Sequence, residues 1–505
     1  MTTTMRRRAA ALASAAAAAV LLAACGTPVV NPVSGQSERS AMSESQELEA
    51  GRKAHRDVLK DYTPVADLAL QAYVDSVGQK LARQSHRANL KWTFTVLDSQ
   101  EVNAFALPGG YVYITRGLMA YLDSEADLAG VLGHEIGHVT ARHAAQRESR
   151  AQSAGFGVLA ASVVGAVLEG AGVQGAGQLA NQSAQAAAAG YVSRYGREQE
   201  LQADQLGAEY LARAGYNPSN MIDVIRVLKD QERYADDNAR AEGRTPAARN
   251  SWLASHPSSD QRLEEITRTA ARYPASGYGD DQRSRYLKAI DGLTFGESAA
   301  QGLTRGRTYY HEELGFAITA PHGWSIVNGN DQLLIVNGTR DAGVVLRVAP
   351  SAMGLDHDTV IRNLLNPTQG RAERVSLGPN RLAATRFVGE RRSDDGVQPL
   401  RVTVVTGPSN RVYLIGHAAA DGHALNANRE ALRDTEETFR SITGAERSTV
   451  SPWRLHTTAL PGGGFAELAR RSPLGARAEQ QLLLLNAAYG GQAAPAPGTQ
   501  VKVVE

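Results

Sequence analysis

The segment His134-Glu135-Ile136-Gly137-His138 has the residue types and the spacing of a metal site. Residues four apart lie on one face of a helix, so both imidazoles can reach a single ion. Glu135 can hold a water bound to that ion and remove its proton. The alternative is a pair of core histidines beside a surface glutamate. We interpret the segment as a zinc site, because such a pentapeptide arises by accident in only about one chain in a hundred of this length.

The residues around the motif predict the helix that this geometry needs. Ser124-Glu125-Ala126-Asp127 has the form of a capping box, which marks the start of a helix. The run from Leu128 to Arg142 contains no proline and repeats apolar residues at helical spacing. We therefore expect one continuous helix through both histidines.

A catalytic zinc site usually has three protein ligands and one open position. One arrangement places a third histidine six residues after the second, preceded by a glycine, but Ala144 and Ala141 occupy those places. The other takes a glutamate from a later helix. Glu200 and Asp204 lie four apart in a helical stretch from Arg197 to about Ala214, so they face one side. We expect Glu200 to bind the metal and Asp204 to fix the tautomer of a ligand histidine; taken alone, such a pair is usually a solvated helix face.

Five segments of the sequence, in chain order, match a known family. They are Asn31-Pro32-Val33-Ser34-Gly35, Asn103-Ala104-Phe105-Ala106-Leu107-Pro108-Gly109-Gly110, the His134 motif, the stretch from Arg197 to Asp204, and His256-Pro257. With them the chain resembles the HtpX/CAAX-prenyl-protease family of zinc metallopeptidases, in its soluble periplasmic branch, over about residues 30–270.

The resemblance implies a role for each matching residue. His134, His138 and Glu200 would be the ligands of one Zn²⁺ per chain, and Glu135 would be the general base. His256 would either sit over the zinc as a plug or stabilise the reacting substrate, whereas a lone His-Pro in a loop is by itself more often structural.

One position departs from the family. The family has a Ser-Arg pair before the ligand glutamate, and this chain has Gly196-Arg197, with Ser193-Arg194 just upstream. We place Arg197 in the site, although the sequence leaves open which arginine matters.

The segment around residue 105 is expected to bind substrate. Val112 and Ile114 alternate in a strand-like way after a Pro-Gly-Gly turn. Metallopeptidases of this kind bind substrate as an added strand along an exposed sheet edge. We therefore assign substrate binding to Asn103, Ala104 and Phe105; an ordinary hairpin is the alternative.

The first residues have the features of a lipoprotein signal peptide. Arg6-Arg7-Arg8 is a positive region before the apolar stretch Ala9–Ala24, which is short for a membrane span. The sequence around Cys25, the only cysteine, resembles the bacterial lipobox, so Cys25 would carry the lipid anchor. Gly26 stands where lipoproteins retained in the inner membrane have aspartate. We expect a periplasmic protein anchored by lipid, with the outer membrane favoured over the inner.

Composition limits the class of partner and the number of domains. The 53 basic and 52 acidic residues leave a net charge of +1, so charge gives no reason to expect nucleic acid as a partner. We expect an α+β protein with a mainly helical, zincin-type peptidase domain that has a small edge sheet. The expected order is a signal peptide at 1–24, a lipidated tether at 25–45, the metallopeptidase domain at 46–300, a small α+β accessory domain at 307–445 and a LysM-like module at 451–505.

Two segments have further expected roles. The insert 151–190, rich in alanine and glycine, is expected to form a helical lid or flap, with a buried core helix as the alternative. The module at 451–505 is similar to a degenerate LysM module, which would imply contact with peptidoglycan, although Gly462-Gly463-Gly464 replaces the expected Gly-Asp turn.

Two functions remain open at this point. The first is a zinc endopeptidase that degrades misfolded or stalled envelope proteins. The second is an assembly factor or chaperone of the envelope with a mostly plugged protease site. Four intact site residues, His134, Glu135, His138 and Glu200, favour the peptidase.

Overall fold

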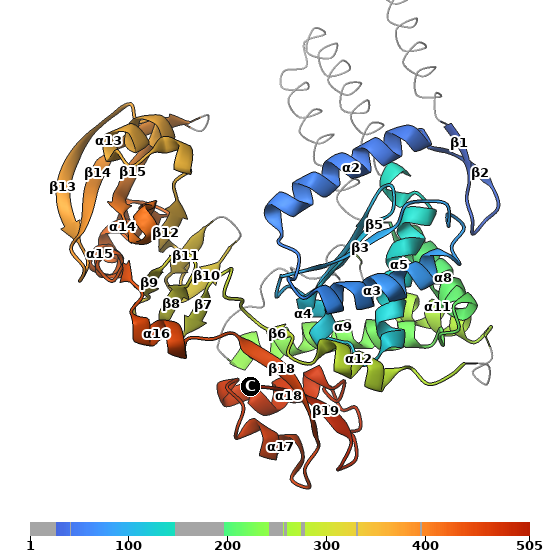
Figure 1. Cartoon of the computed structure of the whole chain (residues 1–505). Helices are drawn as coiled ribbons and strands as arrows, with labels where there is room; N and C mark the ends of the chain where they lie inside the picture. Colours follow the sequence, from blue (N-terminus) through green and yellow to red (C-terminus); the bar gives the residue numbers. More distant parts are fainter. Residues whose placement is uncertain are drawn as a thin grey trace, which may run out of the picture. The chain divides into compact units, whose positions relative to one another are not determined.

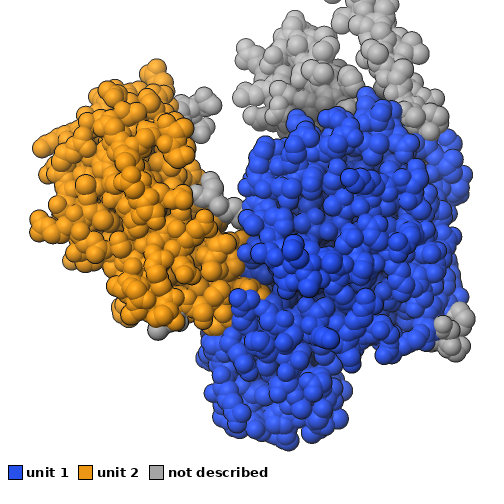
Figure 2. Space-filling view, in the orientation of Figure 1, with its two compact units in different colours: residues 1–293, 454–505 blue, residues 294–453 orange. Residues whose placement is uncertain are grey.

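The computed structural model describes residues 27–40, 42–146, 196–241, 256, 260–273, 278–329, 332–393 and 396–505. The expected signal peptide, Cys25 and the insert 151–190 lie outside these residues. No helix in the described part of the chain is long and apolar enough to cross a membrane. The chain divides into two compact units, one within residues 1–293 and 454–505 and the other within residues 294–453 (Figure 2).

The first unit is mainly helical, and residues 93–115 form a small sheet in it, which agrees with the expected α+β class (Figure 1). Its sheet has the order β3-β5-β4, with β3 parallel and β4 antiparallel to β5. The turn from β4 to β5 uses Gly109 and Gly110 at φ of 82° and 97°, a region that favours glycine. The strands are β3 (Thr93–Leu97), β4 (Ala104–Leu107) and β5 (Tyr111–Thr115), and the helices are α2 (Glu44–Asp61), α3 (Leu68–Ala82), α4 (Arg116–Tyr121), α5 (Glu125–Thr140), α8 (Arg197–Arg213), α9 (Asn220–Ala241), α11 (Asp260–Ala270) and α12 (Arg283–Ile290).

Helix α5 is the core of this unit. It begins with the expected capping box, in which Ser124 and Asp127 each bond the other's backbone N–H. Every residue from Glu125 to Thr140 is buried, so the helix is covered on all sides. The predicted helix through both histidines is confirmed, and it ends two residues earlier than expected.

The segment expected as a tether is structured over residues 27–40. Strands β1 (Thr27–Val30) and β2 (Ser37–Ser40) pair as an antiparallel hairpin. The side-chain oxygen of Asn31 accepts hydrogen bonds from the backbone N–H of Val33 and Ser34, which turns the chain between the strands. This local turn is the reason that a short polar segment without apolar periodicity still forms a hairpin.

Residues 454–505 group with the first unit by their contacts. Their order is β18 (Trp453–Ala459), α17 (Gly464–Ala469), α18 (Ala478–Leu485) and β19 (Gln500–Val504), with β18 antiparallel to β19. The fully buried Lys502 of β19 donates hydrogen bonds to the carbonyl oxygens of Ala120 and Leu122, at 3.1 and 2.6 Å. These carbonyls lie at the C-terminal end of helix α4, where a cation is favourable.

The second unit contains a seven-stranded antiparallel sheet in the order β10-β11-β12-β16-β15-β14-β13 and a four-stranded sheet in the order β17-β9-β8-β7. Apolar clusters lie on both faces of the larger sheet, one around Phe439 and one around Val360. The helical stretch after residue 419 is divided into α14 and α15, which end at Ala427 and Glu437, and residues 440–441 form strand β17. The elements are β6 (Thr294–Phe295), β7 (Leu303–Arg305), β8 (Thr308–His311), β9 (Phe316–Thr319), β10 (Ser325–Asn328), β11 (Leu333–Val336), β12 (Ala342–Val348), α13 (His357–Val360), β13 (Gln369–Leu377), β14 (Leu382–Ser393), β15 (Gly396–Thr406), β16 (Val412–Ala419), α14 (Gly422–Ala427), α15 (Arg429–Glu437), β17 (Arg440–Ser441) and α16 (Gly444–Thr449).

Candidate metal centre

Two helices bring the expected ligands together. Helix α5 carries His134 and His138, and helix α8 packs along it and carries Glu200. The helices can approach closely because glycines lie where they meet. A Cβ built on Gly137 would lie 2.8 Å from the backbone oxygen of Ala203, and one on Gly207 would lie 3.1 Å from the backbone nitrogen of His134. This close approach allows a short glutamate side chain to reach both histidines.

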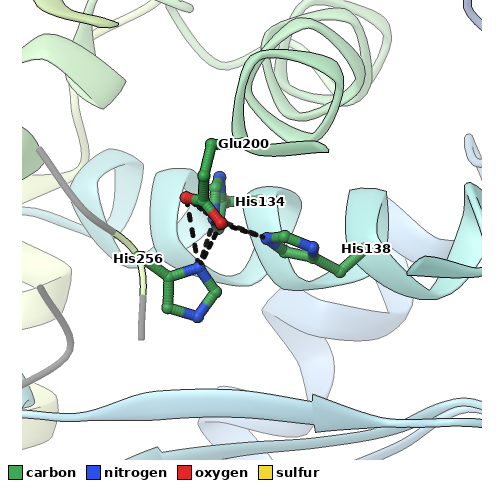
Figure 3. A group of neighbouring side chains, drawn as sticks. All are labelled: His134, His138, Glu200 and His256. Carbon is green, nitrogen blue, oxygen red and sulfur yellow. Dashed lines mark hydrogen bonds and ion pairs between the residues drawn. The ribbon is translucent and has the colours of Figure 1, made fainter. Parts of the chain in front are cut away.

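Four buried side chains converge on one point (Figure 3). The two Nε2 atoms of His134 and His138 lie 3.0 Å apart. The carboxylate of Glu200 lies 3.5 Å from Nε2 of His138 and 3.6 Å from Nε2 of His134. Nδ1 of His256 lies 3.2 Å from Nε2 of His134 and 3.0 Å from the Glu200 carboxylate. One ligand atom from each of the four side chains lies within 4.8 Å of the other three.

These separations fit a tetrahedral metal ion. Bonds of about 2.0–2.1 Å to zinc place neighbouring ligand atoms about 3.3 Å apart, close to the 3.0 to 3.6 Å observed between the imidazole nitrogens and the Glu200 carboxylate. Burial, followed by the neighbouring histidines, holds the pKa of His138 well below its ordinary value, so its imidazole is neutral. Neutral imidazoles and a carboxylate are the donor set that zinc takes in catalytic sites.

Asp204 has the position expected for a residue that orients a ligand. Its Oδ1 lies 2.8 Å from Nδ1 of His134 and accepts that N–H, which leaves Nε2 facing the other ligands. Burial opposes ionisation of Asp204, but Arg262 outweighs it and lowers the pKa to about 2. Asp204 is therefore a carboxylate at neutral pH.

The arginine in contact with the site is Arg262 of α11, which the sequence interpretation missed. Its guanidinium donates two hydrogen bonds to the Asp204 carboxylate, at 2.6 and 2.7 Å, and lies 2.9 Å from that of Glu200. Burial opposes ionisation of Glu200, yet His256 and Arg262 outweigh it and lower the pKa. Arg197, which we expected in the site, is the first residue of α8, lies exposed, and bonds the side chain of Gln261 at 3.4 Å.

The sequence did contain a signal for Arg262. Helix α11 buries Arg262, Ile266 and Ala270, which lie four apart on its inward face. A charged residue on that face is costly unless it is paired, so it indicates a buried carboxylate opposite.

Glu135 and His256 lie beside each other at the ligands. Both side chains are 1% exposed, and Nε2 of His256 lies 3.7 Å from a carboxylate oxygen of Glu135. Burial opposes protonation of His256, but the carboxylates of Glu200 and Glu135 outweigh it and raise the pKa. His256 thus fills the fourth corner of the ligand group and contacts the expected base.

The expected substrate segment lies on the edge strand of the small sheet. Strand β4 contains Ala104 and Phe105. Among the residues that the structure describes, β4 pairs with β5 alone, so it is the edge strand of the sheet. The ring of Phe105 stacks on Tyr113 at a centroid distance of 4.8 Å. Asn103 precedes the strand, and its backbone bonds Thr115 in both directions, which fixes the start of β4. The second hydrogen-bonding side of β4 is the one that an added strand would use.

Comparisons with known proteins agree with this geometry. Residues 68–270 match the family model described as peptidase family M48. A putative beta-barrel assembly-enhancing protease of Vibrio cholerae is 31% identical over 248 residues, which cover 49% of each chain. The beta-barrel assembly-enhancing protease of Escherichia coli K12 is 30% identical over 240 residues, or 47% of each chain.

Relatives with lower identity include mitochondrial metalloendopeptidases. The mitochondrial metalloendopeptidase OMA1 of Schizosaccharomyces pombe is 27% identical over 241 residues, which cover 46% of this chain and 64% of that protein. The chain spans about half the length of the first curated relatives it matches. A solved structure of LpqN from Mycobacterium tuberculosis covers 25% of this chain and 83% of its own at 14% identity and a TM-score of 0.20, too weak a likeness to establish a fold.

Proposed function

Through residues 68–270 the chain belongs to peptidase family M48, and on this premise we propose that it is a zinc-dependent endopeptidase of the bacterial envelope that degrades misfolded or stalled envelope proteins. The observation that supports this most is the convergence of His134, His138 and Glu200 with Glu135 beside them. A protein that acted only as a scaffold would have no use for a buried base next to a metal-binding group.

The arrangement divides the chemistry among the residues. His134, His138 and Glu200 would hold the ion, which when bound polarises the scissile carbonyl and makes water a stronger acid. Glu135 takes the proton of the attacking water and passes it to the leaving amine. Asp204 keeps Nε2 of His134 free of a proton, and Arg262 keeps Asp204 and Glu200 ionised. Burial of these groups excludes bulk water and strengthens each electrostatic contact.

An unfolded chain is the substrate class that fits the site. A polypeptide added along β4 would gain main-chain hydrogen bonds, with little demand on its sequence. Most strands of a folded protein are already paired within it, so misfolded or unassembled envelope proteins are the proposed substrates. Lipidation at Cys25 would anchor the enzyme to the periplasmic side of a membrane, with the outer membrane favoured. Contact of residues 451–505 with peptidoglycan would keep the enzyme near the cell wall.

The position of His256 supports a second, related function. Because its Nδ1 lies within 3.2 Å of both His134 and Glu200, it can occupy the open position that substrate needs. The resting protein would then have low activity until a substrate or partner displaces His256, as in an assembly factor whose protease site is mostly plugged.

The test uses the purified full-length chain with zinc and an unfolded, casein-like substrate. Glu135→Gln should retain one zinc per chain and lose activity by about 10²–10⁴-fold, the usual contribution of a general base. Glu198→Gln is the matched control, because Glu198 is an exposed residue of α8 near the ligand, and it should change neither zinc content nor activity. His134→Ala should lower zinc content well below one per chain. Near-native turnover by Glu135→Gln, or full zinc content in His134→Ala, would contradict the proposal.

A further inference from the structure

A buried histidine outside the ligand group contacts the ligand His138. His143 is 0% exposed, and its Nδ1 lies 2.8 Å from Nδ1 of His138, the ring nitrogen that points away from Glu200 (Figure 3). The other ring nitrogen of His143 lies 3.2 Å from Oε1 of Gln202 on α8. One of the two facing Nδ1 atoms must carry the proton and the other must accept it.

The N-terminal hairpin determines which nitrogen carries that proton. Oδ1 of the buried Asn31 accepts hydrogen bonds from the backbone N–H of Val33 and Ser34, at 2.8 and 3.1 Å. A backbone amide can only donate, so the orientation of the Asn31 side chain is settled and its Nδ2 is a donor. That Nδ2 donates to Oε1 of Gln202 at 3.2 Å.

The donor in the first hydrogen bond, from Asn31 to Gln202, then determines the donor in each of the next two. Oε1 of Gln202 accepts from Asn31, so the same oxygen also accepts from Nε2–H of His143. A neutral His143 protonated at Nε2 has a lone pair at Nδ1, which accepts Nδ1–H of His138. His138 therefore keeps Nε2 without a proton, as a metal ligand must.

We infer that His143 is a positioning residue for the metal ligand His138, and that Asn31 and Gln202 set the tautomer of both histidines. This inference rests on the proposed metal site. It assigns to the Asn31 turn a role in orienting a metal ligand, in addition to its role in closing the hairpin. The two ligand histidines are then oriented differently, His134 by the carboxylate of Asp204 and His138 by a neutral relay that ends in the hairpin β1–β2.

The backbone supports this placement of His143. Helix α5 ends before Arg142, which has a φ of 57°, a left-handed conformation that a non-glycine residue adopts only at a cost. This turn brings the His143 ring against His138, with centroids 4.9 Å apart. The buried carboxylate of Glu47 holds Arg142 at 3.1 Å and also pairs with Arg87 at 2.6 Å, so helix α2 anchors the turn.

The experiment measures the zinc dissociation constant of the full chain by competition with a chromophoric chelator. Asn31→Asp keeps the oxygen that accepts from the backbone but removes the donor to Gln202, so Gln202 must turn its N–H₂ toward residue 31 and reverse the relay. We expect zinc to bind about 10–100-fold more weakly, the usual cost of losing a partner that orients a ligand. His143→Ala should have a similar effect, and His143→Asn should restore much of the affinity, because its Oδ1 can accept Nδ1–H of His138.

The double variant separates the relay from a general loss of structure. In the His143→Asn background the link to Gln202 is absent, so Asn31→Asp should no longer weaken zinc binding. Asn337→Asp is the matched control, because Asn337 accepts two backbone N–H groups in a similar turn of the second unit, and it should leave zinc affinity unchanged. If Asn31→Asp weakens binding equally in both backgrounds, or not at all, the inference is wrong. If His134→Ala also binds zinc normally, the proposed metal site itself fails, so the two failures are distinguishable.

Discussion

Gly207→Val tests whether the close packing of α8 on α5 positions the metal ligands. A Cβ on residue 207 would lie 3.1 Å from the backbone nitrogen of His134 and 3.2 Å from the carbonyl carbon of Gly133. Both atoms belong to the backbone of α5, so no side-chain rotation can relieve the contact. Valine adds two further methyl groups, and helix α8 has to move away from α5, taking Glu200 with it.

The change in the free energy of unfolding caused by Gly207→Val results from two opposing effects. Overpacking a close-packed core costs about 1–3 kcal/mol, while replacing a glycine inside a helix by valine recovers a few tenths of a kcal/mol. We expect the free energy of unfolding of the first unit to fall by about 1–2 kcal/mol. Zinc affinity should fall by about tenfold or more, because ligand groups tolerate displacements of only about 0.5 Å.

The assay combines the zinc dissociation constant with hydrogen exchange of α5 and α8, read by mass spectrometry. Gly130→Ala is the control, because a Cβ there meets only ordinary contacts, the nearest at 3.4 Å from a side-chain atom of Val224. It should leave zinc binding intact and gain up to about 1 kcal/mol from helix propensity. Wild-type zinc affinity with unchanged exchange in Gly207→Val would refute the idea that this packing sets the ligand geometry.

Three further predictions concern charged residues. Arg262→Met leaves two buried carboxylates without their cation and should destabilise the first unit by about 3–5 kcal/mol in denaturant unfolding, whereas Arg197→Met, at an exposed position, should change stability little. Burial lowers the pKa of Lys502 from 10.5 to about 8. Between these two pH values the unfolded chain binds more protons than the folded one, so the contribution of Lys502 to stability rises with pH there, by about 3 kcal/mol in total. The stability of wild type relative to Lys502→Met, measured from pH 7.5 to 10, should therefore increase, and a constant difference would contradict this. His256→Ala should raise basal proteolysis with zinc retained if His256 plugs the site; a lower rate with zinc retained would assign it to the stabilisation of substrate instead, and no change would remove it from the site.

The grouping of His134, His138 and Glu200 could be predicted from sequence because much of it depends on local spacing. His134 and His138 are four apart on one helix, as are Glu200 and Asp204, and helical geometry alone puts each pair on one face. The capping box at Ser124 is equally local. Such features depend on a few neighbouring residues, so the pattern fixes them before the rest of the fold is known.

The missed residues depend on contacts between distant segments. Arg262 meets Asp204 only after α11 packs on α8. Arg197 was expected in the site because it matches the arginine that the family has before the ligand glutamate. His143 lies against His138 because the backbone of Arg142 is left-handed, a conformation that the residue types at this turn do not predict. The hairpin at residues 27–40 was missed because two short strands held by an asparagine turn have no apolar periodicity.

The buried Lys502 also determines when the first unit can finish folding during synthesis. Its ammonium group bonds the carbonyl oxygen of Leu122, which precedes it by 380 residues and lies just before the cap of α5. A ribosome that adds about 5–20 residues per second needs roughly 20–80 s to cover that distance. During this interval the carbonyls at the end of α4 lack the Lys502 side chain that bonds them, and the whole second unit is synthesised. Completion of the first unit is therefore a late event of biosynthesis, because the carbonyls at the end of α4 receive the Lys502 side chain only after β19 has been made.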